Sequence, residues 1–105
     1  MGLDMMLKSI RRDVFYSVDR DDFWEIEFPE SKELIYWRKE YDIDGWFREN
    51  LKFYEECTEE ITKEKLIKFA EFLKTTGKKV YVEEINKLIK ENDFDNNVIY
   101  YKHFN

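Results

Sequence analysis

The sequence predicts an α+β domain in which a small antiparallel sheet of about four strands packs against about three helices. Apolar residues alternate with polar ones through the first third of the chain, and they recur at spacings of three and four through most of the rest. No Gly-, Ser- or Pro-rich linker interrupts the chain, so residues 1–105 are expected to form a single domain.

The first third of the chain is predicted to form an antiparallel meander of three strands. A polar break at 11–13 and a polar loop at 19–22 separate these strands, and Pro29 ends the third because proline cannot donate to a central ladder. The side chains expected on one face of each strand are Leu3, Met5 and Leu7, then Val14, Tyr16 and Val18, then Trp24, Ile26 and Phe28.

The next segment, 33–39, fits two structures. Its apolar residues suit a strand that is covered on both faces, and they equally suit a helix capped by Ser31.

The remainder is predicted to be mainly helical. Thr62 is expected to cap the second helix, Gly77 to follow its end, and the third helix to end near Asn92, before a turn and a closing strand at 98–101. The apolar faces of the three helices are Ile43, Trp46, Phe47, Leu51 and Tyr54; Leu66, Phe69, Ala70 and Leu73; and Ile85, Leu88 and Ile89.

The composition is that of a folded protein of the cytoplasm. Nine Phe, seven Tyr and three Trp supply the apolar area that a core of this size needs. Cys57 is the only cysteine, which excludes an intrachain disulfide and a four-thiolate zinc site. Neither a signal peptide nor an apolar run of membrane-spanning length is visible, so no membrane contact is expected.

The acidic balance bears on the choice of partner. The formal net charge is -6, which opposes direct binding to nucleic acid because that binding depends on basic groups. The same charge favours a protein partner with a basic surface. The alternative is that the charge serves solubility alone.

An acidic run in the first third is the predicted partner-binding face. Carboxylates along a strand edge can occupy a groove built for a nucleic-acid backbone, where they meet Arg and Lys side chains. The run also suits the solvated outer face of a hairpin, and it lacks the loop glycine of an EF-hand, so no metal is expected. The residues assigned to this face are Asp19, Asp21, Asp22, Glu25 and Glu27.

A second segment mixes aromatic rings with basic groups and supplies the alternative function. Rings that stack on bases and cations that hold phosphates are the components of a nucleotide site. The same rings are also expected in a core, because they bury a large apolar area. This alternative ligand-binding set is Arg11, Tyr36, Trp37, Arg38 and Lys39.

No catalytic constellation is visible, so the chain is predicted to be a non-enzyme without a cofactor. His103 is the only histidine, and its place in a terminal strand promises neither an orienting partner nor a protected pocket. Cys57 stands among glutamates, which oppose thiolate formation. Phosphate-binding glycine loops and the common hydrolase motifs are absent from the sequence.

Several short segments together resemble a family of small, uncharacterised phage and prophage proteins that begin with a string close to MGLDMYL. The segments that match are Met1–Leu7, Tyr36–Lys39, Trp46–Phe47, Cys57 and Tyr100–Tyr101. Met6 replaces a usual aromatic residue, and Asp44 replaces a common histidine. The resemblance implies a viral origin, and small phage proteins often antagonise host defence. The chain is therefore predicted to inhibit a host protein, such as a CRISPR nuclease or another nucleic-acid enzyme, by occupying its surface.

Overall fold

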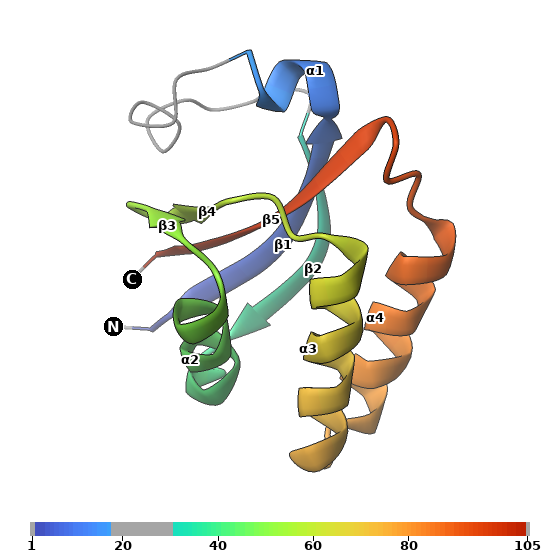
Figure 1. Cartoon of the computed structure of the whole chain (residues 1–105). Coiled ribbons are helices and arrows are strands. Elements are labelled where there is room, and N and C mark those ends of the chain that lie inside the picture. Colours follow the sequence, from blue (N-terminus) through green and yellow to red (C-terminus); the bar gives the residue numbers. More distant parts are fainter. Residues whose placement is uncertain (1, 18–30, 105) are drawn as a thin grey trace.

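The structure, a computed structural model, describes residues 2–17 and 31–104. It has an α+β fold in which a five-stranded antiparallel sheet carries α2, α3 and α4 on one face, while the short α1 lies at one end of β1 (Figure 1). The elements are β1 (Asp4–Arg11), α1 (Arg12–Phe15), β2 (Lys32–Arg38), α2 (Tyr41–Asn50), β3 (Phe53–Tyr54), β4 (Cys57–Thr58), α3 (Lys63–Thr75), α4 (Lys79–Glu91) and β5 (Asn97–Phe104).

The sheet is built around the first and last strands rather than as a meander. Its order is β2-β1-β5-β4-β3, and β1 pairs with β5 from Asp4 opposite Phe104 to Arg11 opposite Asn97 (Figure 1). The expected meander is wrong for β1, because its neighbours are β2 and β5. The strand expected at 24–28 lies outside the described residues.

The strand expected at 14–18 is also wrong in its described part. β1 continues to Arg11, and the chain then forms the single helical turn α1. This turn buries the Phe15 ring completely. Arg12 forms a bidentate ion pair with Glu60, in which Nη1 lies 2.8 Å from Oε1 and Nη2 lies 2.6 Å from Oε2. These long-range contacts outweigh the local alternation, which alone favours a strand.

The ambiguous segment is a strand. In β2, Ile35 and Trp37 are buried, whereas the intervening Tyr36 is 48% exposed. This alternation is the period of a strand that covers a core with one face.

The three longer helices lie where the sequence predicts them, with one difference. Thr62 caps α3 by accepting a hydrogen bond from the Lys65 backbone N–H, and Gly77 follows α3 with a φ of +76°. The first of the three stops early: α2 ends at Asn50, and Tyr54 belongs to β3 instead of the helical face.

The core has two parts, one on each face of the sheet. The larger part fills the space between the sheet and the three long helices, and its sheet residues with no exposed surface are Met5, Leu7, Ile99 and Tyr101. The smaller part lies on the opposite face and consists of Ile10, Phe15, Cys57, Val98 and Tyr100.

Candidate functional site

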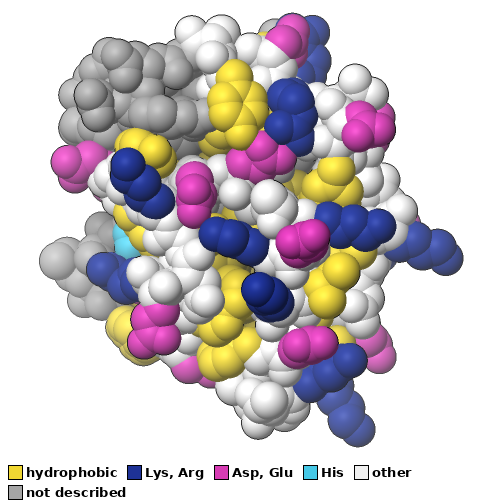
Figure 2. Space-filling view, viewed as in Figure 1, with side chains coloured by type: hydrophobic (Ala, Val, Ile, Leu, Met, Phe, Trp, Pro, Cys, Tyr) yellow, Lys and Arg dark blue, Asp and Glu magenta, His cyan; other side chains and the backbone are white. Residues whose placement is uncertain are grey.

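The predicted acidic face, Asp19, Asp21, Asp22, Glu25 and Glu27, lies outside the described residues. The composition of the segment that contains these residues nevertheless shows where the negative charge of the chain is concentrated. Residues 18–30 contain six acidic residues and one basic residue, so this segment carries five of the six net negative charges of the chain. The rest of the chain is nearly neutral, and Figure 2 shows acidic and basic side chains interspersed on the described surface.

Trp37 of the alternative ligand-binding set belongs to the core. Its side chain is 3% exposed and packs edge-on against Phe69 and Tyr81, with ring centroids 6.0 Å apart in both cases. The indole Nε1 is buried and has no hydrogen-bond partner among the described residues. The ring therefore presents no face to a surface ligand.

The other members of that set divide between the two ends of β1. Tyr36 Oη donates to Asp4 Oδ1, and Arg38 Nε lies 3.9 Å from the same oxygen. Lys39 and Arg38 both lie close to Gly2, so three of the five residues share one end of the sheet. Arg11 is paired with Asn97 at the other end of β1, roughly 23 Å away at the rise of a strand. The structure does not bring it to the other three.

His103 has the orienting partner that its terminal position did not promise. Its Nδ1 lies 2.6 Å from Oδ1 of Asp44 in α2, and Tyr101 Oη donates to the same oxygen at 2.6 Å. Arg48 Nε donates to the other carboxylate oxygen, Oδ2, at 2.6 Å. The expectation of an unpartnered histidine is wrong, because β5 extends to Phe104 and so carries His103 back over α2.

This Asp44 cluster, formed by Asp44, Arg48, Tyr101 and His103, lies between α2 and β5; Asp44, Tyr101 and His103 are buried, and Arg48 is exposed. Burial by itself raises the pKa of Asp44, but hydrogen bonds from Tyr101, Arg48 and His103 outweigh it and hold the pKa below its ordinary value. Burial, followed by the bond to Asp44, raises the pKa of Tyr101. Asp44 is therefore a carboxylate and Tyr101 a hydrogen-bond donor at neutral pH.

The chemistry that the cluster can perform depends on whether the edge of the His103 ring that faces away from Asp44 is accessible. A carboxylate on Nδ1 fixes the tautomer and orientation of an imidazole, as in proton-transfer sites. Here the ring packs against Phe53, with centroids 4.8 Å apart, and His103 is only 9% exposed. Asp44 is the only side chain that bonds to the ring among the described residues. The described contacts connect the end of β5 to α2.

Sequence reasoning missed this cluster because Tyr101 and His103 lie 57 and 59 positions after Asp44 in the chain. One signal was present: Asp44 is adjacent to Ile43 and three residues before Phe47, so helical spacing places it at the border of the apolar face.

Cys57 lies in the smaller part of the core. Burial raises the pKa of its thiol to about 11, and Glu56 adds to the rise while Lys102 opposes it. The thiol therefore stays protonated at neutral pH, and a protonated thiol is a poor nucleophile. Within the two described stretches, no three His, Cys, Asp or Glu side chains gather in a way that would hold a metal ion.

None of the helices in the described part of the chain is long and apolar enough to cross a membrane. Comparison with known protein families, curated proteins and solved structures finds no match to this chain.

Proposed function

We propose that the protein is a small acidic binding protein, encoded by a phage or prophage, that inhibits a host protein in the host cytoplasm. Its target is a defence effector such as a CRISPR nuclease, or another nucleic-acid enzyme. The observation that supports this most directly is the concentration of charge: residues 18–30 carry five of the six net negative charges.

The distribution of charge favours one contact region over a diffuse acidic surface. A net charge that served solubility alone would be spread over the surface. Here a nearly neutral scaffold carries one strongly acidic segment between α1 and β2. Carboxylates at this density can replace phosphates as acceptors for Arg and Lys, and the attraction also speeds association.

The test measures whether the protein competes with nucleic acid. The probe is a CRISPR nuclease and a panel of other nucleic-acid enzymes, each titrated with the protein while DNA binding is followed. We expect one enzyme of the panel to lose DNA binding. The affinity of the protein for that enzyme should fall steeply as salt rises from about 0.05 M to about 0.5 M, because exposed charge pairs are screened over this range.

Two charge-neutralised variants locate the contact. The first changes the five predicted contact acids to Asn or Gln and should abolish the competition. The second removes the same number of charges from exposed acids of the described surface and should retain it; these acids are Glu49, Glu56, Glu64, Glu71 and Glu83. Equal loss in both variants would show that only total charge matters. Tight binding that ignores salt would contradict the electrostatic mechanism.

The alternative, a module that sequesters a nucleotide, has less support. Only Tyr36, Arg38 and Lys39 lie together, and Tyr36 is already engaged by Asp4. A nucleotide that binds the folded state raises the melting temperature. We expect a flat thermal-shift response across a nucleotide panel, and a clear rise with one nucleotide would favour the alternative.

A further inference from the structure

β2 is an edge strand with an open side. It has a neighbouring strand on one side only among the described residues. The Lys39 backbone N–H donates to the Leu3 carbonyl, so this pair is a hydrogen-bonded pair of the β1–β2 ladder. Such pairs recur every second residue, which turns the backbone groups of Ile35 and Trp37 toward β1 and those of Tyr36 outward.

The irregularity in the ladder lies beside this open side. The register shifts between Leu7 and Lys8, where Leu7 faces Ile35 but Lys8 faces Glu33. Leu34 is thus the extra residue of a bulge and has no partner in β1.

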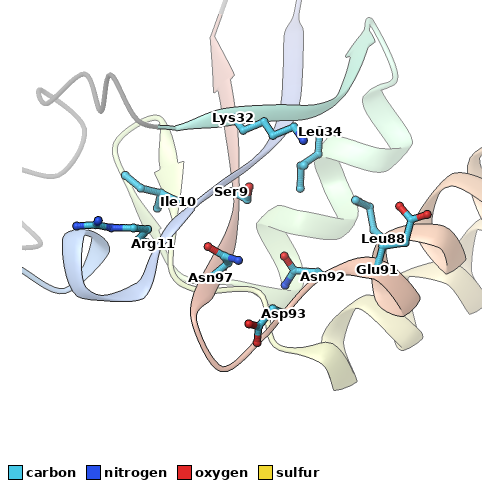
Figure 3. A pocket seen from close by; sticks show the side chains of 10 residues that line it. All are labelled: Ser9, Ile10, Arg11, Lys32, Leu34, Leu88, Glu91, Asn92, Asp93 and Asn97. Carbon is cyan, nitrogen blue, oxygen red and sulfur yellow. The ribbon is translucent and has the colours of Figure 1, made fainter.

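A groove runs between β2 and α4 along this region. One part has a volume of about 460 Å³ and an adjoining part about 280 Å³, and they share Lys32, Leu34, Leu88 and Glu91. Figure 3 shows Leu34 of β2 on one wall and Leu88 and Glu91 of α4 on the other. Both leucines are only partly buried, so the groove has an apolar centre.

The wall formed by α4 has a distinct charge pattern. Glu84, Leu88 and Glu91 all line the groove, and their spacing places them on one stripe of the helix; Lys87 also lines the groove, beside this stripe. Leu88 is therefore flanked by a carboxylate about one turn away on each side. Together, the lining residues of the two parts carry one more acidic than basic side chain.

We propose that this groove binds an extended segment of another protein, which adds to β2 as a sixth strand. The outward backbone groups of β2 can extend the ladder only to another extended backbone, which determines the conformation of the occupant. The stripe on α4 predicts the side chains of the occupant, which should be a basic, an apolar and a basic residue at alternate positions. Alternate residues of a strand are roughly 6.6 Å apart, and the stripe residues are roughly 6 Å (Glu84 to Leu88) and roughly 4.5 Å (Leu88 to Glu91) apart along the axis of α4. The residues that line this site do not include any of the acidic segment 18–30.

The test uses a capped, fluorescent peptide with the sequence Thr-Lys-Thr-Val-Thr-Lys-Thr and the full-length protein. We expect saturable binding, with amide chemical-shift changes in β2 and the second half of α4. A peptide with Glu in place of Lys should bind at least about tenfold more weakly. The Lys peptide with N-methylated backbone amides should not bind, because it cannot extend the ladder.

Substitutions in the groove complete the test. Leu88→Lys should weaken binding about tenfold or more, whereas Val80→Lys, an exposed position near the start of the same helix, should leave it unchanged. Tyr36→Pro removes an outward N–H, a change that edge strands tolerate, and should also weaken binding. No saturation up to about 1 mM, or shift changes elsewhere, would overturn the proposal. Self-association of the protein that is lost on Tyr36→Pro would also overturn the proposal, because it would show that a second copy of the chain occupies the groove.

Discussion

The Asp44 cluster connects α2 to β5, and its contacts all depend on Asp44. Its carboxylate has hydrogen-bonding contacts with Arg48, Tyr101 and His103, all at 2.6 Å. We expect Asp44→Asn to lower the free energy of unfolding by about 1–3 kcal/mol, because buried partners lose a charged acceptor. Urea denaturation measures this. Glu49→Gln, an exposed change in the same helix, is the control and should stay within about 0.5 kcal/mol of the wild type. Equal stability of the two variants would contradict the role of Asp44.

The same carboxylate predicts a dependence of stability on pH. The pKa of Asp44 is lower in the folded protein than its ordinary value of 3.8. A lowered pKa stabilises the fold above the ordinary value, and this contribution is lost as the pH falls through the lower, folded pKa. The difference in unfolding free energy between the wild type and Asp44→Asn should therefore shrink as the pH falls below 3.8. A difference that stays constant down to pH 2 would contradict the lowered pKa.

At the scale of elements, two glycines make opposite predictions. Gly45 is inside α2, and a Cβ built on it would meet no atom within 4 Å. Gly45→Ala should stabilise the protein by about 0.5–1 kcal/mol, because alanine restricts the unfolded chain and favours helix. Gly77 has a φ of +76°, where a side chain is strained, so Gly77→Ala should destabilise by about 1 kcal/mol. Thermal unfolding followed by circular dichroism measures both, and a destabilising Gly45→Ala would show that α2 needs the glycine.

Elements with a strong local signal are predictable from this sequence. The Thr62 cap, the apolar face of α3 and the glycine after it agree with one another, and the structure confirms all three. In the predicted face of α4, Ile85 is fully buried, whereas Leu88 and Ile89 are partly buried against the core. Local consistency of this kind is what makes an element readable without knowledge of its neighbours.

The region after α2 shows where local reasoning fails. The spacing of apolar residues continues to Tyr54, but Leu51 is extended, with φ −131° and ψ 149°. Glu55 has a φ of 60°, which allows a tight turn between the two-residue strands β3 and β4. These strands are joined to the sheet through Cys57 opposite Lys102 of β5. Strands this short carry no period of their own, so only the distant partner reveals them.

At the scale of the whole molecule, the predicted class held while the strand order did not. An α+β class follows from periodicity, which is a local property. The pairing of the first strand with the last depends on which buried faces meet, and periodicity alone carries no information on this. The Asp44 cluster is a consequence of this pairing, because β5 brings Tyr101 and His103 to α2.

The central position of β5 gives the last prediction. β5 is paired with β1 along its whole length and joins β4, and through it β3, to the rest of the sheet. A chain truncated after Asn96 would lose the buried Val98, Ile99, Tyr100 and Tyr101, and with them residues of both parts of the core. It would also expose the ladder groups of β1 on that side. We therefore expect no cooperative urea transition in this variant, whereas a control that lacks only Asn105 should unfold like the full chain. Because β1 and β5 lie at opposite ends of the sequence, a folded truncated chain would mean that β1, β2 and the helices form a stable unit without β5.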